Sequence, residues 1–390
     1  MDPIHDEALA LAAETVALRR DLHAHPEVAF EERRTAGVVA EYLRSLGLRP
    51  RTGLGKTGVL AVLEGARHGR TVLARADMDA LPLADAKDVA YRSTIEGVAH
   101  ACGHDGHTAV LLSVARLLSE RQEALRGRVV FVFQPAEEIV QGAAAMLADG
   151  ALDGIEPDTA VGLHLSSMHP TGTLALRAGP AMAAADAFLL VLHGRGGHAA
   201  KPNEAVDPIV MAAHLITTLQ ALVSREVDPI DEAVISITSV HGGTAFNVIP
   251  ESVELKGTLR TFSPSTREYL RHRILELSEA IATGHRGRLE VDWREGSPPV
   301  VNDEAATERV RLVARSVAGI ERIETGSLIM GGDDMALWLQ RAPGCYWFVG
   351  ASGSEASAYA HHHPKFDIDE AALPLAVELF TKVILDALDA

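Results

Sequence analysis

Residues 100–107, HACGHDGH, place one cysteine, three histidines and an aspartate within eight positions of a chain that has only one other cysteine. Thiolate and imidazole groups are ligands for zinc and the neighbouring divalent metals. Cys102 and His104 are two positions apart, so their side chains would leave the same face of an extended segment. We expect such a segment to precede a helix that starts near His107. One metal ion could then bind both side chains.

Further acidic and imidazole groups follow the strands that the sequence predicts. Glu137 and Glu138 come after the apolar run RVVFVFQPA, His164 lies within VGLHL, and three histidines occupy 361–363. In an open sheet, binding groups gather at the carboxyl ends of the strands. Two adjacent glutamates cannot easily share one orientation. We therefore expect one of them to bind metal and the other to face a water molecule.

Each of these groups, taken alone, has an ordinary structural explanation. A lone cysteine is usually a small apolar core residue, and a lone His164 would be a hydrogen-bonded core histidine. Adjacent glutamates are typical of a solvated helix start, where the helix dipole favours negative charge, and a histidine run is typical of a surface. Five metal-binding groups at the strand ends of one predicted sheet nevertheless favour a metal centre.

Hydrophobic patterns divide the chain into two kinds of region, each with its own order of predicted strands and helices. Residues 71–165 alternate short β-branched runs with helical periods such as HTAVLLSVARLLSE, which predicts a large, mixed, mostly parallel sheet with helices on both faces, an α/β fold. Residues 185–296 follow the order β-α-β-β-α-β, which is that of a split ferredoxin-like α+β unit. The pattern of residues 71–165 then returns from about residue 297. We predict a discontinuous catalytic domain, residues 1–184 and 297–390, with a smaller domain inserted at 185–296.

Composition narrows the class of protein. The 390 residues are 47% hydrophobic, enough for a large core. The net charge of −17 and an aromatic content of only 4% argue against a nucleic-acid-binding protein. The opening MDPIHDEALA lacks a basic stretch followed by an apolar one, and no apolar run has the length of a membrane span. We therefore expect a cytoplasmic protein with no membrane partner, whose cysteines are reduced.

Nine motifs together resemble the aminoacylase and carboxypeptidase family of dinuclear, zinc-peptidase-like metallopeptidases. The similarity is greatest to the amidohydrolase branch that includes hippurate hydrolases and auxin amino-acid conjugate hydrolases, and it extends over nearly the whole chain. The motifs, in order, are RRDLHAHPEVAFEE (19–32), RADMDALP (75–82), HACGHDGHTA (100–109), FQPAEE (133–138), GLH (162–164), GRGGHAAKP (194–202), NVIP (247–250), GTLRTF (257–262) and HHHPKFD (361–367).

The resemblance implies two divalent metal ions in each subunit. Thiolate, imidazole and carboxylate donors together are compatible with Zn, Mn, Co or Ni. The ligands that the resemblance implies are Cys102, His104, Glu138, His164 and one histidine of the 361–363 run. His362 is the choice within that run, because the family ligand lies two residues before a proline, here Pro364. His361 and His363 remain outside candidates.

The resemblance also implies roles beyond metal binding. Glu137 would be the general base, and His198 of the inserted domain would support the carbonyl oxygen of the substrate. Asn247 and Arg260 would hold the carboxylate of the substrate. The inserted domain would act as a lid and a dimerisation domain, giving a homodimer or a homotetramer.

One motif departs from the family pattern. Where relatives commonly have Ser-Glu-Asp-Phe, this chain reads GGDDMA at 331–336, with Asp333 as a shorter acid and Met335 in place of the aromatic residue. We expect the change to affect the substrate pocket but no metal ligand.

Three functions of different classes fit the sequence. The first is a metal-dependent amidohydrolase that cleaves the amide bond of N-acyl amino acids. The second is a dipeptidase or carboxypeptidase that acts on short peptides with the same centre. The third, a small-ligand-binding protein without catalysis, is weakest because every expected ligand and both glutamates are present.

Overall fold

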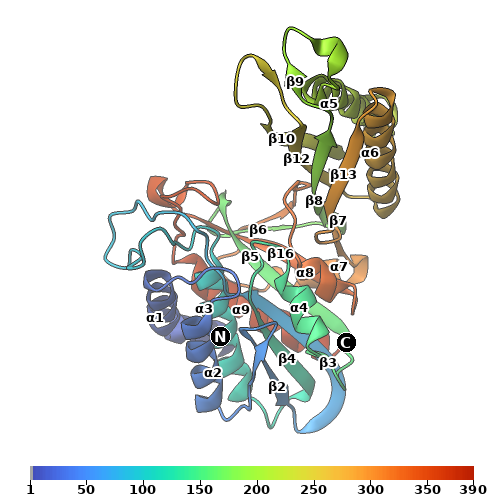
Figure 1. Cartoon of the computed structure of the whole chain (residues 1–390). Coiled ribbons are helices and arrows are strands. Elements are labelled where there is room, and N and C mark those ends of the chain that lie inside the picture. The colour runs from blue at the N-terminus through green and yellow to red at the C-terminus, as the bar shows by residue number, and fades with distance from the viewer. Residues whose placement is uncertain (1–2) are drawn as a thin grey trace. The chain divides into compact units, whose positions relative to one another are not determined.

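The computed structural model describes residues 3–390 and divides the chain into two compact units (Figure 1). Unit 1 comprises Met1–Ala181, Val300–Ser327 and Asp334–Ala390, and unit 2 comprises Met182–Pro299 and Leu328–Asp333. The short segment Leu328–Asp333 therefore groups with unit 2, although the sequence placed it in the flanking domain. The physical reason is backbone pairing, because the N–H of Ala183 donates to the carbonyl groups of Ile329 and Gly331.

Unit 1 is built on an eight-stranded mixed sheet with the order β1-β2-β4-β3-β5-β16-β6-β15. Its central pairs, β4-β3, β3-β5 and β5-β16, are parallel, as is β6-β15. The strands are β1 (Arg51–Leu54), β2 (Gly58–Glu64), β3 (Arg67–Asp77), β4 (Arg126–Gln134), β5 (Thr159–Pro170), β6 (Thr173–Leu176), β15 (Arg322–Thr325) and β16 (Gly344–Ser352). A separate ribbon pairs β7 (Gly179–Met182) with β14 (Val300–Asn302). The predicted mixed, mostly parallel sheet is confirmed.

Helices cover this sheet, and the α-helices of unit 1 are α1 (Pro3–Ala24), α2 (Arg33–Ser45), α3 (His104–Ser119), α4 (Gly142–Ala148), α7 (Glu304–Ala314), α8 (Met335–Leu339) and α9 (Ala372–Leu388), with a 3-10 turn η2 (Glu355–Ser357). Helices α3 and α9 pack on β3, and α1 packs against both, while α4 and α8 contact each other. The burial of strand β4 shows why both faces of the sheet must be covered. Phe131 and Phe133 join the core with α3 and α9, whereas the alternate residues Val130 and Val132 are equally buried but lie outside that cluster.

Unit 2 has the ferredoxin-like order that the sequence predicted. Its elements are β8 (Ala184–His193), β9 (Gly197–His198), η1 (Pro202–Glu204), α5 (Pro208–Arg225), β10 (Ala233–His241), β11 (Val248–Ile249), β12 (Ser252–Thr261), α6 (Pro264–Gly284) and β13 (Arg288–Arg294). The antiparallel sheet runs β10-β12-β8-β13. Leu190 and Leu192 of β8 alternate with less buried residues and pack with Leu215 and Leu219 of α5, so this unit has its own core.

Among residues 3–390, no helix combines the length and the apolar character that crossing a bilayer demands.

Candidate metal centre

The cysteine-histidine segment adopts a tighter form than the sequence predicted. Helix α3 begins at His104 rather than near His107, so the prediction that Cys102 and His104 share an extended segment is wrong. Gly103 takes a left-handed conformation with φ of 100°, and its carbonyl accepts a hydrogen bond from the N–H of His107 at 3.0 Å. This turn starts the helix three residues early. Cys102 therefore lies just before the helix and His104 at its first position, and both are buried.

Two imidazoles in unit 1 have one nitrogen anchored and the other available. Nδ1 of His104 donates to the carbonyl of Asp79 at 2.9 Å, and Nδ1 of His164, on β5, donates to the carbonyl of Leu165 at 2.8 Å. In the neutral rings, Nε2 is then unprotonated and can bind a cation. A metal-bound histidine typically donates its other N–H in this way.

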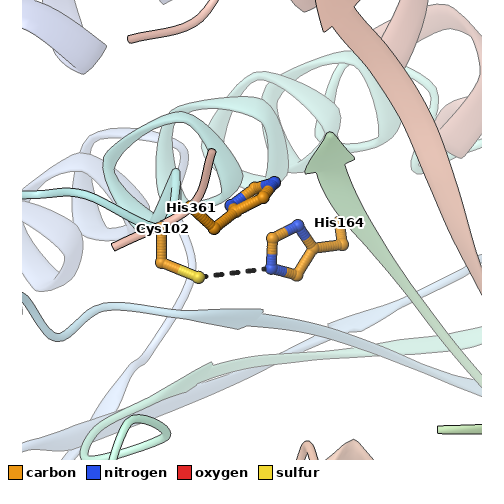
Figure 2. A group of neighbouring side chains, drawn as sticks. All are labelled: Cys102, His164 and His361. Atoms are coloured by element: carbon orange, nitrogen blue, oxygen red, sulfur yellow. Dashed lines mark hydrogen bonds between the residues drawn. The ribbon is translucent and has the colours of Figure 1, made fainter. Parts of the chain in front are cut away.

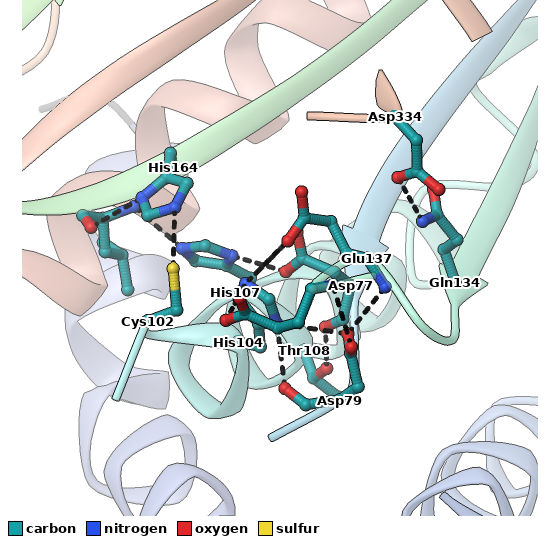
Figure 3. A network of polar contacts seen from close by, with 12 residues as sticks. Asp77, Asp79, Cys102, His104, His107, Thr108, Gln134, Glu137, His164 and Asp334 are labelled. Atoms are coloured by element: carbon teal, nitrogen blue, oxygen red, sulfur yellow. Dashed lines mark hydrogen bonds and ion pairs between the residues drawn. The ribbon is translucent and has the colours of Figure 1, made fainter. Parts of the chain in front are cut away.

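The donor atoms near these imidazoles fit a divalent cation. Nε2 of His104 and Oε1 of Glu138 are buried, and neither has a hydrogen-bond partner within residues 3–390. One ligand atom from each of Cys102, His104 and Glu138 lies within 4.8 Å of the others. Leaving buried polar atoms unpaired costs free energy. A bound cation would satisfy both of them, which favours this cluster as a metal site. Figure 3 shows Cys102 and His104 of the cluster beside Asp77 and Asp79.

The two glutamates sit on a turn that other carboxylates hold in place. The N–H groups of Glu137 and Glu138 donate to Oδ1 and Oδ2 of Asp79, each at 3.0 Å. The preceding Ala136 has a left-handed φ of 52°, and its N–H donates to Glu32 at 2.8 Å. Asp79 thus orients both glutamates through their backbone. The sequence offered only the RADMDALP motif as a signal for this role, and no role was predicted for Asp79 or Glu32.

Two histidines of the 361–363 run lie beside different groups of donor side chains. Nε2 of His362, the ligand chosen from the sequence, lies 3.3 Å from Oε2 of Glu138. His361 instead lies with Cys102 and His164, with one ligand atom of each within 4.8 Å of the others (Figure 2). His363 is exposed, and its Nδ1 accepts a hydrogen bond from the N–H of Lys365.

A second buried network supports the centre from the end of β3. Asp77 accepts hydrogen bonds from Arg75 at 2.6 Å and from Nδ1 of His107 at 2.6 Å, while Nε2 of His107 accepts from the N–H of Leu165 at 2.8 Å. Arg75 also donates to Asp334 at 3.1 Å. Asp77 and His107 could hold a metal together with His104 by distance alone, but their hydrogen bonds suit them better to positioning the strand ends. Asp334 lies in the GGDDMA segment, between the departing positions Asp333 and Met335, and matches the aspartate of the family pattern.

Electrostatics indicate that this cluster is short of positive charge. Burial raises the pKa of Glu138 to about 7. Burial and the charge of Glu138 raise the pKa of the Cys102 thiol well above its usual value. For His104, burial acts to lower the pKa, but the charges of Asp77 and Cys102 outweigh it and hold the pKa well above the usual value. Without a divalent cation, bound protons supply the positive charge that these buried groups need, and a cation would replace them.

A third network ties the first helix to both ligand-bearing loops. Arg19 of α1 is fully buried and donates to Asp105 at 2.8 Å and to Asp367 at 2.5 Å. Asp105 directly follows His104 and also accepts from Nδ1 of His23 at 2.7 Å. This explains the RRDLH motif, for which the sequence suggested no task. Arg19 fixes the segment with His104 relative to the segment that follows the histidine run.

The remaining predicted residues lie in unit 2. His198 is exposed on β9, and its Nδ1 accepts from the N–H of Ala200 at 3.1 Å, so the neutral ring carries its proton on Nε2. Asn247 is adjacent, because its carbonyl accepts from the N–H of Ala199 at 3.0 Å. Arg260 is half-buried on β12 and donates to the carbonyl of Asp186 at 3.0 Å. The structure brings His198 and Asn247 together, and no described contact joins Arg260 to them.

Comparison with known proteins gives consistent matches over nearly the whole chain. The chain is 40% identical to N-acetyl-L-cysteine deacetylase of Bacillus subtilis, over 93% of this chain and 85% of the relative. It is 37% identical to thermostable carboxypeptidase 2 of Saccharolobus solfataricus, over 92% of each chain. The crystal structure of the YXEP protein of Bacillus subtilis, described as a dinuclear metal binding peptidase from the M20 family, superposes with a TM-score of 0.84 at 34% identity, over 98% of this chain and 99% of that one.

The family model for peptidase family M20/M25/M40 matches residues 73–386. This range includes the cysteine-histidine segment, the paired glutamates, His164 and the histidine run. The resemblance inferred from the motifs is confirmed, and the chain belongs to peptidase family M20/M25/M40, whose members are hydrolases of amide and peptide bonds.

Proposed function

We propose that this protein is a dinuclear metal-dependent amidohydrolase that cleaves the amide bond of N-acyl amino acids. The observation that carries the proposal is the convergence of thiol, imidazole and carboxylate donors, two of them buried without hydrogen-bond partners in the described part of the chain. The similarity to a deacetylase of an N-acetyl amino acid supports the substrate class.

Two ions would be held by the five ligands that the motifs imply, with Zn, Mn, Co or Ni as candidate metals. These ligands are Cys102, His104, Glu138, His164 and His362. Bound divalent ions polarise a carbonyl group and lower the pKa of water from about 16 toward about 7. The anchored Nδ1 atoms of His104 and His164 support their assignment, since each ring is already oriented.

Glu137 would act as the general base. It accepts the proton of the attacking water and delivers that proton to the leaving amide nitrogen. Its Oε2 lies 3.8 Å from Nε2 of His104, so it borders the ligand cluster. The backbone N–H groups of Glu137 and Glu138 bond to different oxygens of Asp79, so one side chain positions both glutamates.

Unit 2 would supply the groups that recognise the substrate. Nε2 of His198, with its proton, can donate to the carbonyl oxygen as negative charge develops there. The amide of Asn247 and the guanidinium of Arg260 would bind the carboxylate of the amino acid. We further propose that unit 2 serves as the lid and as the contact of a homodimer or homotetramer in the cytoplasm, and that the GGDDMA departure influences the acyl preference.

A substrate panel tests this proposal. Protein treated with a chelator is reloaded with Zn²⁺ or Mn²⁺ and given acetyl, benzoyl and aminoacyl derivatives of one amino acid, and the release of free amino acid is measured. We expect release from the acetyl or benzoyl substrates only after metal is added. No release from any derivative by a protein that has bound metal would overturn the proposal.

The second candidate is a carboxypeptidase, which the similarity to thermostable carboxypeptidase 2 favours. The same panel separates the two activities. A kcat/KM for dipeptides or tripeptides that exceeds the value for acyl amino acids would favour the peptidase.

A further inference from the structure

We propose that His361 is a third ligand, with Cys102 and His164, of a thiophilic metal ion, so that consecutive histidines of the 361–363 run serve two metal positions of different chemistry. This inference rests on the proposed function only in that the chain must bind divalent ions. The family motif accounts for His362 and leaves His361 without a role.

The separation of the first two donors fits one tetrahedral ion. Sγ of Cys102 and Nε2 of His164 lie 3.5 Å apart (Figure 2). Zinc binds sulfur at about 2.3 Å and imidazole nitrogen at about 2.0 Å, and at a tetrahedral angle these two donors are about 3.5 Å from each other. The pair is therefore spaced for a shared ion without further movement.

His361 completes this group from a third direction. Its ring centroid is 5.0 Å from that of His164, at an interplanar angle of 76°, and 4.9 Å from the ring of the buried Phe366. Its Nε2 accepts a long bond of 3.4 Å from the N–H of Ser167, so in the neutral ring Nε2 is unprotonated and can bind a cation. Packing holds the imidazole, and its unprotonated nitrogen has only this long hydrogen bond to lose when a cation binds.

The next residue faces a different partner. Nε2 of His362 lies 3.3 Å from Oε2 of Glu138, close to the separation of about 3.4 Å for nitrogen and oxygen donors on one tetrahedral ion. His362 has a left-handed φ of 66°, and its N–H donates to the carbonyl of Ala101 at 2.7 Å. The chain turns at this residue, which is why adjacent side chains can reach two positions.

Unequal ligand sets predict unequal metals. One thiolate with two imidazoles prefers zinc or cobalt, whereas a position that includes a carboxylate also accepts manganese. We expect the position at Cys102, His164 and His361 to fill first with Zn²⁺ or Co²⁺ and to retain its ion against a chelator. The position at His104, Glu138 and His362 should exchange its ion more readily.

The test compares His361→Asn with His363→Asn, a matched change at an exposed histidine of the same run. Each full-length protein is stripped of metal and titrated with Zn²⁺ against a competing chelator, then with Co²⁺ while the sulfur-to-cobalt charge-transfer and d–d bands are recorded. We expect His361→Asn to weaken the tighter Zn²⁺ equivalent by about tenfold or more and to reduce the tetrahedral d–d intensity. His363→Asn should match the wild type.

An unchanged Zn²⁺ affinity and cobalt spectrum in His361→Asn would overturn the inference and leave the proposed function standing. A wild-type chain that binds neither ion would overturn both. X-ray absorption of wild-type protein with a single Zn²⁺ equivalent needs no variant to fold. We expect sulfur and at least two imidazoles around the zinc, and a spectrum with fewer imidazoles would contradict the proposal.

Discussion

Oδ1 of Asp79 accepts a hydrogen bond from the backbone N–H of Glu137 at 3.0 Å. Asp79 thereby orients the backbone of a neighbouring catalytic candidate. Its other oxygen does the same for Glu138, so one side chain sets the orientation of the proposed base and of a proposed metal ligand.

We expect Asp79→Asn to impair both functions of this turn, because an amide can accept only one of the two N–H bonds and presents a donor to the other. Each hydrogen bond to a charged group contributes about 1.5–3 kcal/mol, so a loss of unfolding free energy in that range should accompany weaker metal binding. Denaturant unfolding and metal titration measure the two effects.

Asp85→Asn is the matched control, since Asp85 also accepts two backbone N–H groups, from Lys87 and Ser93. It should lose comparable stability and keep its metal affinity. Equal metal affinity in both variants would argue against a positioning role for Asp79.

Glu137→Gln should lower kcat by about 10²–10⁴-fold, the usual contribution of general acid-base assistance. Metal content should remain that of the wild type, because Glu137 is not among the proposed ligands. Activity assays and elemental analysis of the same sample check this. Loss of an ion in the variant would reassign Glu137 as a ligand.

Arg19→Met should be strongly destabilising, by about 3–5 kcal/mol, because it leaves the buried carboxylates of Asp105 and Asp367 without their partner. Arg20→Met removes a neighbouring arginine that pairs with Glu370 at the surface, and it should cost at most about 1 kcal/mol. Denaturant unfolding measures the loss of unfolding free energy in each variant. Similar losses from both variants would contradict the role of Arg19 as a buried clamp.

Burial raises the pKa of the Cys345 thiol to about 12 from its usual 9.0. The thiol stays neutral in the fold while it ionises in the unfolded chain, so its contribution to stability is complete below pH 9.0 and is lost as the pH rises toward about 12. Above pH 9.0 this ionisation lowers the free energy of unfolding by up to about 1.4 kcal/mol per pH unit. Cys345→Val should abolish that decrease, because valine does not ionise. Denaturant midpoints at two alkaline pH values measure the slope, and an identical slope in both proteins would refute it.

Much of the fold could be predicted from apolar periodicity. The runs that became β3, β4 and β5 are too uniformly apolar for any place but the centre of a covered sheet, and the β-α-β-β-α-β order of unit 2 follows from its alternating patterns. The pairing of Leu328–Asp333 with unit 2 could not be predicted, because it depends on single backbone hydrogen bonds formed far along the chain.

The candidate site was predictable where residue type alone restricts the chemistry, as for Cys102 and the paired glutamates. The start of α3 was missed because it depends on a left-handed glycine, whose φ the sequence does not specify. The division of labour between His361 and His362 was also beyond the sequence, since it depends on a left-handed residue in a run of identical side chains.

The interrupted sheet of unit 1 affects how the protein is made. Strand β5 ends at Pro170, and its parallel neighbour β16 begins only at Gly344. At about 5–20 residues per second on the ribosome, the nascent chain leaves this apolar strand edge uncovered for roughly 9–35 s, while unit 2 is synthesised in between. An uncovered strand edge can pair with other chains during that interval, and the proposed ligand of the 361–363 run is translated only after it.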